Sequence, residues 1–412
     1  MSSNQSIALL GEWEGYRIGT VGRFGPAEGR PGSEVWIELH PNPESIPRCS
    51  GCRGEVRRIH DVTERWVREL PLLDARTLLL VHRRRIECDQ CGPRLEYLSW
   101  LGRYSRVTRR LAESVARMCA VLPIKHVAEF FGLGWDTVKA IDKAYLTEKL
   151  GPVDLSGADV LAMDEFAIRK GHRYATVVID PRVKRVLWIG RGARKREEIR
   201  PFFELLGEEG RKRVKAVAMD MNAAYEQEVR AQCPQADVVY DLFHVVAKYG
   251  REVIGRVRVD EANRLRRDRK ARKIIKGARW LLLRNYENLK RREDRIRLSE
   301  LLTANKALLV VYLLKDDLKH LWDYRYPGAA LRFWKQWYRR AVASRIEPLR
   351  RFARNFKKRI AGILAHCRWP LHTSLLEGIN NKIKVLKRMA YGFRDDDYFF
   401  LKVRAAFPGI PG

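Results

Sequence analysis

Hydrophobic and polar positions alternate through the first 40 residues, between breaks that contain Gly and Pro. The stretch EVWIELH (34–40) shows the period of two that a strand with one buried face requires. Two further stretches are strand-like: ERWVREL (64–70) and ARTLLLVHRRRIEC (75–88). We therefore expect a small β-rich unit in this part of the chain.

The hydrophobic period becomes helical after residue 106. Apolar positions recur every three to four residues over 107–121, 124–131 and 135–150, and Gly132-Leu133-Gly134 separates the last two segments. This arrangement predicts a helix-turn-helix, in which the final helix would present three polar side chains to DNA: Thr137, Lys139 and Lys143. The alternative is a helical hairpin that only packs neighbouring domains together.

Strand and helix patterns alternate between residues 158 and 248, which indicates a mixed α/β layer. The expected strands are 159–166, 172–180, 185–190, 214–220 and 236–241, and the expected helices are 196–206 and 223–233. Residues 249–366 have long, charged helical patterns and predict an all-helical insertion. Two closing helices are expected over 371–389 and 394–405.

Four of the seven cysteines form two tight pairs, Cys49-Ser-Gly-Cys52 and Cys88-Asp-Gln-Cys91, with 35 residues between them. A CxxC turn points two thiolates at one place, and two such turns complete a tetrahedral shell for Zn²⁺. Because four thiolates close the shell, the expected role of this zinc is structural. Ordinary buried or redox-active thiols are the alternative. The odd total and the three scattered cysteines favour a reducing compartment.

The large excess of positive charge indicates which class of molecule the protein binds. Lys and Arg total 81 and Asp and Glu total 50, so the formal net charge is +31. A surface this basic needs a polyanionic partner to offset its self-repulsion, either nucleic acid or an anionic membrane. Apolar runs such as Ala307–Leu314 are too short to span a bilayer, and the first residues lack a signal-peptide pattern. We expect a cytoplasmic, nucleoid-associated protein of several domains.

Two carboxylates stand at the C-terminal ends of expected buried strands, Asp164 and Asp220, and Glu377 lies on the polar face of an expected helix. Buried carboxylates are costly unless they are paired or bind a metal. Two aspartates and a glutamate can hold a pair of Mg²⁺ ions for in-line phosphoryl displacement. Capping and salt-bridge roles are the alternatives that spacing alone leaves open.

Cations that suit a phosphate backbone gather in two later segments. Residues 251–279 contain 12 Lys and Arg against 4 Asp and Glu, which predicts a phosphate-contacting surface or a solvated helix face. On the helix of Glu377, the expected DNA contacts are Lys384, Lys387 and Arg388. Four tryptophans of the insertion are expected in its core: Trp280, Trp322, Trp334 and Trp337. The acidic cluster 395–397 is expected to cap the last helix.

The chain resembles the transposases of the ISL-three group of bacterial insertion sequences. The matching stretches are DEFAIRKGHRYATVVID (164–180), AMDMNAAY (218–225), YDLFHVV (240–246) and EGINNKIKVLKRMAYGFRDDDYF (377–399). The paired CxxC turns, the helix-turn-helix and the stretch ARWLLLRNYENL (278–289) match as well. The resemblance therefore covers nearly the whole chain, from about residue 9 to residue 407.

The resemblance implies a ribonuclease-H-like core with an acidic metal triad. Carried over residue by residue, the triad is Asp164, Asp220 and Glu377, with two Mg²⁺ ions that Mn²⁺ can replace. Asp241 and His244 match an Asp-x-x-His motif with an auxiliary role. The family commonly has Pro after its first cysteine, where this chain has Ser50, so the turn of the expected zinc site is less typical.

The same resemblance implies the domain organisation. A compact α/β core has short loops, so the 156 residues between Asp220 and Glu377 require an inserted domain. The expected domains are a four-cysteine zinc-binding β module (1–103), a helix-turn-helix domain (104–154), a ribonuclease-H-like core (155–248 and 367–407) and a helical insertion (249–366).

The expected function is that of a DNA transposase. It would bind the terminal inverted repeats of its own element, cleave at the element ends and join the 3′-hydroxyls to target DNA. Its partners would be double-stranded DNA and a second copy of the chain, because two ends must be paired. The alternatives are a DNA-binding regulator with an inactive ribonuclease-H-like scaffold and a structure-selective DNA nuclease.

Overall fold

The computed structural model describes residues 12–25, 32–73, 75–102, 105–169, 173–192, 195–371 and 374–410, without the side chains of 374–376. The chain divides into two compact units, and each is described by itself. The first unit takes the chain up to Gly151 together with Leu386–Lys402. The second takes Pro152–Val385 together with the segment that begins at Val403.

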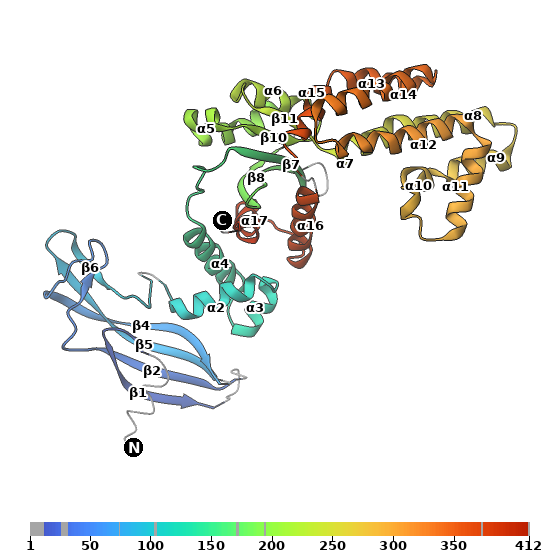
Figure 1. Cartoon of the computed structure of the whole chain (residues 1–412). Helices are drawn as coiled ribbons and strands as arrows, with labels where there is room; N and C mark the ends of the chain where they lie inside the picture. The colour runs from blue at the N-terminus through green and yellow to red at the C-terminus, as the bar shows by residue number, and fades with distance from the viewer. Residues whose placement is uncertain are drawn as a thin grey trace. The chain divides into compact units, whose positions relative to one another are not determined.

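A six-stranded sheet forms most of the first unit (Figure 1). Its strands are β1 (Tyr16–Phe24), β2 (Glu34–Pro41), β3 (Arg48–Cys49), β4 (Ile59–Leu72), β5 (Ala75–Cys88) and β6 (Gly92–Tyr97). The strand order is β1-β2-β5-β6-β3, with β4 also paired to β5. Ile37 and Leu39 of β2 are buried together with Leu79 and Val81 of β5. The three stretches expected to be strands (34–40, 64–70 and 75–88) therefore form β2, β4 and β5, as predicted.

The helix-turn-helix region consists of three helices: α2 (Arg109–Cys119), α3 (Ile124–Phe131) and α4 (Trp135–Leu150). Thr108 caps α2 by accepting from the backbone N–H of Leu111. Gly132 ends α3 in the left-handed conformation, with φ of 58°, which a residue without a Cβ adopts at little cost. Val115, Val127 and Val138 pack in one core, one from each helix. The three predicted helices are confirmed.

The second unit contains a five-stranded mixed sheet. Its strands are β7 (Val160–Arg169), β8 (Arg173–Asp180), β9 (Arg185–Arg191), β10 (Ala216–Met219) and β11 (Asp237–Tyr240), in the order β11-β10-β7-β8-β9. β8 is antiparallel to both β7 and β9, whereas β10 is parallel to both β7 and β11. The connecting helices are α5 (Arg196–Arg213) and α6 (Ala223–Gln232). Leu161, Phe202 and Tyr225 share one core, so the predicted α/β layer is confirmed.

Every regular element between Leu242 and Cys367 is helical, and the structure describes all of these residues. The elements are α7 (Leu242–Tyr249), the π-helix η1 (Gly250–Ile254), α8 (Gly255–Arg264), α9 (Arg269–Gly277), α10 (Arg279–Leu283), η2 (Tyr286–Asn288), α11 (Arg292–Ala304), α12 (Lys306–Lys319), η3 (His320–Asp323), α13 (Pro327–Ala343), α14 (Glu347–Lys357), α15 (Ile360–Leu364) and η4 (Ala365–Cys367). Their apolar faces share one core with the helices that cover the sheet.

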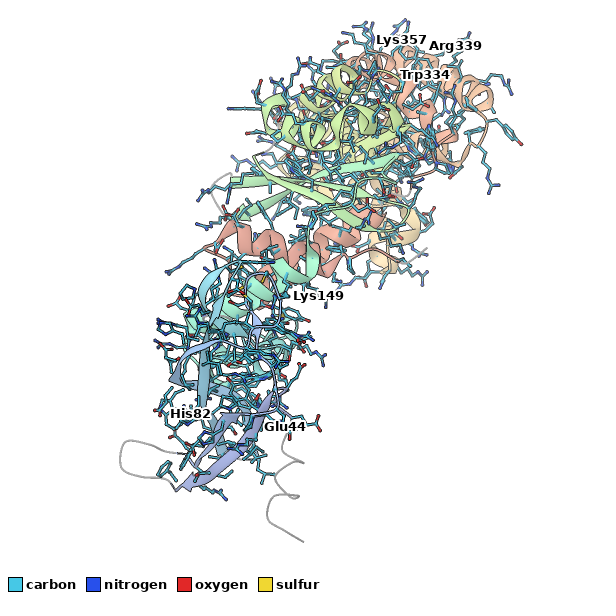
Figure 2. The ribbon with its side chains drawn as sticks, turned by 90° about the vertical axis from the view of Figure 1, so that its left-hand side faces the viewer. Glu44, His82, Lys149, Trp334, Arg339 and Lys357 are labelled. Atoms are coloured by element: carbon cyan, nitrogen blue, oxygen red, sulfur yellow. The ribbon has the colours of Figure 1, made fainter. Side chains whose placement is uncertain are left out.

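The tryptophans of this helical block differ in burial. Trp334 of α13, labelled in Figure 2, and Trp337 are buried as predicted, and Trp322 is half-buried. The core position expected for Trp280 is wrong, because this side chain is 66% exposed. The reason is local: α10 has only five residues and buries Leu282, which leaves Trp280 on its outer side.

Two helices close the chain, α16 (Ser374–Met389) and α17 (Asp396–Ala406). On α16, Ile379 and Ile383 are buried, as the predicted apolar stripe requires. Asp395 accepts a hydrogen bond from the backbone N–H of Tyr398 at 3.0 Å, so the predicted capping is confirmed for this aspartate. In the described part of the chain, no helix combines the length and the apolar character that crossing a membrane requires.

Candidate active site and zinc cluster

Three aspartates lie at or beyond the last paired residues of the parallel strands. Asp220 and Asp241 directly follow β10 and β11, whereas Asp164 lies within β7. The strand end expected at Asp164 is wrong, because β7 continues to Arg169 through its pairing with β8. The pairing of β10 with β7 sets Ala218 opposite Ala162, so the same register continued by two residues sets Asp220 opposite Asp164. On the other side of β10, the pairing with β11 continues to set Asp220 opposite Asp241. Neighbouring strands lie about 4.8 Å apart. The sheet therefore gathers three carboxylates at one edge.

Asp164 is held by donors from two elements. The side-chain amide of Asn380 on α16 donates to Asp164 Oδ2 at 2.5 Å, and the backbone N–H of Glu165 donates to Oδ1 at 2.7 Å. Burial raises the pKa of Asp164 to about 6, and these donors and the nearby His244 oppose the rise. The carboxylate thus lacks full compensation for its lost hydration.

Asp241 positions His244. One carboxylate oxygen of Asp241 accepts from the backbone N–H of Phe243 at 2.6 Å and so caps α7, and the other lies 2.9 Å from His244 Nδ1. Burial disfavours the charged imidazole, but the Asp241 hydrogen bond and the charges of Asp220 and Asp164 outweigh it. They raise the pKa of His244 to about 9. The charges of all three aspartates therefore act on His244, the histidine of the Asp-x-x-His motif, and favour its protonated form.

Glu377 lies on the first turn of α16, three residues before Asn380, and its side chain is exposed. This spacing puts both side chains on the same face of the helix. Among the described residues, two groups of possible metal ligands have their ligand atoms within 4.8 Å of one another, and the Asp164, Asp220 and Glu377 triad is not one of them. That these three acids bind common metal ions stays a prediction.

The residues at this edge suit a divalent cation. Three carboxylates face a single imidazole, so the local charge is negative even when His244 is protonated. Among the described residues, the buried Oδ1 atom of Asn380 has no hydrogen-bond partner, so it is a further oxygen acceptor next to Asp164. Mg²⁺ and Mn²⁺ prefer such oxygen ligands. A cation here would also relieve the repulsion between the neighbouring carboxylates.

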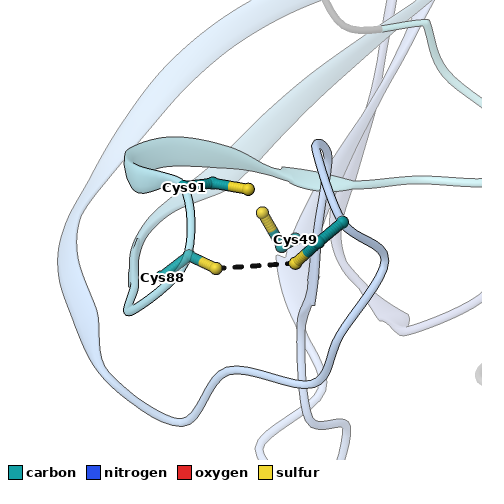
Figure 3. Close-up of side chains that lie close together, drawn as sticks. Cys49, Cys88 and Cys91 are labelled. Atoms are coloured by element: carbon teal, nitrogen blue, oxygen red, sulfur yellow. Dashed lines mark hydrogen bonds between the residues drawn. The ribbon is translucent and has the colours of Figure 1, made fainter.

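The two CxxC turns meet in the first unit as predicted. The sulfurs of Cys49, Cys52, Cys88 and Cys91 all lie within 4.8 Å of one another. Figure 3 shows Cys49, Cys88 and Cys91 with their sulfurs turned toward one place. Cys49 and Cys88 are buried, and the Sγ atoms of Cys52 and Cys88 are 3.6 Å apart. Four gathered thiols are the ligand set of a structural Zn²⁺ site.

The local backbone favours the thiolate of Cys49. Burial disfavours the charged form of Cys49, but hydrogen bonds from the backbone N–H groups of Gly51 and Cys52 and from neighbouring thiols outweigh it. They lower the pKa of Cys49 to about 7. Gly51 is also required sterically, because a Cβ at this position would lie 2.9 Å from Cys91 Sγ.

Lys139 and Lys143 of α4, which are expected to contact DNA, form salt bridges within the protein. Asp395 Oδ2 lies 3.1 Å from Lys139 Nζ and 2.9 Å from Lys143 Nζ, all within the first unit. Thr137 is exposed. The two lysines therefore help to hold the start of α17 against α4, and their contact with DNA stays a prediction. The sequence pattern did not indicate this shared aspartate.

Sequence reasoning also missed the residues that support the acidic edge. Asn380 stands three residues after Glu377, and this spacing on a polar helix face is the signal that the sequence offers for it. Asn222 caps α6 and donates to Glu165 Oε1 at 3.1 Å. Further along α16, Lys384 and Arg388 are exposed, and burial lowers the pKa of Lys387. These basic side chains extend from the same helix that supplies Asn380.

Comparison with known families divides the chain into three matched segments. The zinc-finger of the transposases of IS204, IS1001, IS1096 and IS1165 matches residues 46–91, which contain all four clustered cysteines. The helix-turn-helix domain of transposase family ISL3 matches residues 96–146. The ISL3 transposase family itself matches residues 161–403, more than half of the chain, including the acidic edge.

Whole proteins are similar as well. The transposase for insertion sequence element IS1001 of Bordetella parapertussis is 55% identical over 99% of both chains. The transposase for insertion sequence element IS1557, from two strains of Mycobacterium tuberculosis, is 27% identical over 92% of this chain and 91% of its own length.

Among solved structures, the Drosophila P element transposase strand transfer complex aligns with 72% of this chain and 90% of its own, at 10% identity. Its TM-score of 0.32 is too low to carry an argument. The family matches and the relative from Bordetella parapertussis suffice: this chain belongs to the ISL3 family of transposases.

Proposed function

We propose that this transposase cleaves DNA at the ends of its own insertion sequence and joins the freed 3′-hydroxyls to target DNA by metal-dependent phosphoryl transfer. The observation that carries the proposal is the common register of Asp164, Asp220 and Asp241 at one sheet edge. Glu377 would complete the catalytic triad from α16, whose Asn380 is bonded to Asp164. Three antiparallel strands followed by two parallel ones support a ribonuclease-H-like core.

Each residue of the edge has a role in this proposal. Asp164, Asp220 and Glu377 would hold two Mg²⁺ ions, which when bound neutralise the scissile phosphate and favour ionisation of the attacking hydroxyl. Asn380 fixes the orientation of the Asp164 carboxylate. Asp241 occupies Nδ1 of His244, so Nε2 is the nitrogen that can donate to a phosphate oxygen. Water and a 3′-hydroxyl are equivalent attacking groups, so one site serves cleavage and joining.

Recognition of the element ends would come from the N-terminal part of the chain. The zinc-binding module (1–103) and the helix-turn-helix domain (104–154) would bind the terminal inverted repeats, and a second copy would bind the paired end. Lys139 and Lys143 would exchange Asp395 for DNA phosphates. Contacts near the core (155–248 and 367–407) would come from basic residues of α16: Lys384, Lys387 and Arg388. The insertion (249–366) would contribute its basic stretch 251–279.

Substitution of Asp164 tests the proposal. The Asp164→Asn variant keeps the shape of the side chain and removes its charge, so we expect nicking and strand transfer on end-bearing DNA to fall roughly 10³-fold or more, as when a catalytic unit loses a member. End binding in a gel-shift assay should persist. Asp154→Asn is the matched control, because Asp154 is an exposed carboxylate of the same unit that accepts from Ser156 N–H.

The same assay separates the alternatives. Normal nicking by the Asp164→Asn variant would contradict the assignment of this residue. Wild-type protein that binds ends but never cleaves them, with Mg²⁺ or Mn²⁺ present, would indicate a regulator with an inactive scaffold. Cleaved ends that are never joined covalently to target DNA would indicate a structure-selective nuclease.

A further inference from the structure

The sheet of the first unit carries a second cluster of possible metal ligands, separate from the four cysteines. Glu38 and His40 lie on β2, two residues apart and therefore on the same face, and His82 lies on β5. The parallel pairing of β2 with β5 sets Leu39 opposite Val81, so the next residues, His40 and His82, are neighbours. Figure 2 labels His82 on this sheet. One ligand atom from each of the three side chains lies within 4.8 Å of the others.

The two imidazoles of this His-Glu cluster converge on one carboxylate oxygen. Glu38 Oε1 lies 2.9 Å from His82 Nε2 and 3.4 Å from His40 Nε2. The two rings stack with centroids 4.3 Å apart and an interplanar angle of 12°. Around a tetrahedral zinc with bonds of about 2.0–2.2 Å, ligand atoms are about 3.3–3.5 Å apart. The three ligand atoms are thus within small side-chain movements of that geometry.

Two neighbouring residues support this arrangement without being ligands. Glu64 of β4 pairs across the strands with His82, and its Oε1 lies 3.7 Å from His82 Nδ1. A carboxylate near the second imidazole nitrogen is the usual outer partner of a metal-binding histidine. On β1, a Cβ at Gly19 would lie 2.7 Å from Cδ2 and 2.9 Å from Nε2 of His40. Glycine at this position leaves the space that the His40 ring occupies.

We propose that Glu38, His40 and His82 bind one divalent transition-metal ion, Zn²⁺ or a chemically similar ion. Two imidazole nitrogens and one carboxylate oxygen are a ligand set that Zn²⁺ accepts in proteins, and three protein ligands leave a position for water. The side chains are half-buried, so an ion can reach them from solvent. Because the ligands come from β2 and β5, binding would stabilise the folded sheet by mass action.

Zinc stoichiometry and affinity of the full-length protein test this site. Zn²⁺ alone is the probe, and metal content is measured after equilibration in a zinc-buffered solution. The wild-type chain should hold two ions. Glu38→Gln and His82→Ala should each weaken the second ion by more than about 100-fold, because even loss of an outer partner costs about 10–100-fold. Cys88→Ser should instead remove the ion of the cysteine cluster.

Three further variants make the test specific. His60→Ala changes an exposed histidine of β4 that pairs with Asp61, so this control should retain two ions. Glu64→Gln and Gly19→Ala leave the ligands in place but disturb His82 and His40, so each should weaken the second ion by roughly 10-fold. A wild-type chain that holds one ion, or a His82→Ala variant that holds two, would overturn the proposal.

Folding defects are separated from ligand loss by two measurements. Glu38→Gln and His82→Ala should each unfold at the wild-type temperature in chelator. Both should show a smaller zinc-dependent rise than the wild type, because only the cysteine cluster still binds zinc. In wild-type protein, Zn²⁺ should shift the imidazole ¹⁵N resonances of His40 and His82 but leave those of His60 unchanged. Unchanged resonances of His40 and His82 would overturn the proposal even if a variant failed to fold.

Discussion

Asn380 links two parts of the candidate active site at the scale of single residues. Its amide donates to Asp164 Oδ2, and it stands one helical turn after Glu377 on α16. Asn380 is therefore a positioning residue, which orients an expected ligand on the sheet and shares a helix face with another. Within the described part of the chain, the hydrogen bond to Asp164 is the one that holds the Asn380 amide, because its buried Oδ1 has no partner there.

Replacing Asn380 by Ala should lower the rate of end cleavage by roughly 10-fold or more, the cost typical of an outer partner of a metal ligand. Binding of end DNA should change little, because the substitution removes no charge. Asn381→Ala is the matched control, since Asn381 is the exposed neighbour on the same helix. Single-turnover cleavage rates and gel shifts compare the variants. Equal rates for the two variants would refute the positioning role.

Only part of this site could be predicted from the sequence. Asp164 and Asp220 could be predicted because each follows an apolar run of a buried strand, and the parallel pairing of β7 with β10 aligns the two positions. Asn380 was not found, because an amide on a polar helix face has the same pattern whether it faces solvent or a buried carboxylate. The distance from Glu377 to the aspartates depends on how α16 packs, which no local pattern specifies.

At the scale of elements, a buried carboxylate joins α5 and α6, the two connecting helices of the second sheet. Glu228 of α6 is fully buried and lies 2.9 Å from Arg196 Nε and 3.0 Å from Arg200 Nε, both on α5. Burial disfavours its charge, but hydrogen bonds from Arg200, Gln232 and Arg196 outweigh this effect. They lower the pKa of Glu228 from 4.5 to about 2.

This depressed pKa predicts a specific dependence of stability on pH. The contribution of Glu228 is fully present above its unfolded pKa, near 4.5, and is lost as the pH falls toward 2. Glu228→Gln should therefore lower the free energy of unfolding by about 2–3 kcal/mol at pH 7, with the difference shrinking below pH 4. Denaturant titrations at several pH values measure it. Exposed Glu204→Gln on α5 should stay within about 0.5 kcal/mol of wild type. A pH-independent loss in Glu228→Gln would contradict the electrostatic origin.

Most elements were predictable, because period-two and helical patterns extend over many residues. The bounds of α3 and α4 coincide with the predicted ones, and Gly132 marks the break between them. The burial of Trp280 was not predictable from the same patterns, because it depends on how short α10 is and on which neighbours cover it. The salt bridges of Asp395 to α4 were equally inaccessible, since they join residues some 250 positions apart along the chain.

For the whole molecule, the charge of +31 is the property that most affects DNA binding. Each phosphate that the protein neutralises releases counterions, so the logarithm of affinity should fall linearly with the logarithm of salt concentration. With about six to ten phosphate contacts, the slope would be about −5 to −9.

Lys384→Ala should reduce that slope by about 1 if this exposed lysine of α16 contacts a phosphate. Lys212→Ala is the control, because Lys212 already pairs with Glu208 and Glu209 and should leave the slope unchanged. The slopes are obtained from DNA affinities measured at salt concentrations from about 50 to about 200 mM. An affinity that does not depend on salt would contradict a phosphate-based interface.

The central claim is that Asp164, Asp220 and Glu377, far apart along the chain, bind common metal ions. Anomalous diffraction from a crystal of the full-length protein soaked in Mn²⁺ tests it most directly. The account predicts manganese peaks coordinated by all three carboxylates, and loss of those peaks in Asp164→Asn. Manganese bound elsewhere, with the three carboxylates directed to separate places, would contradict it.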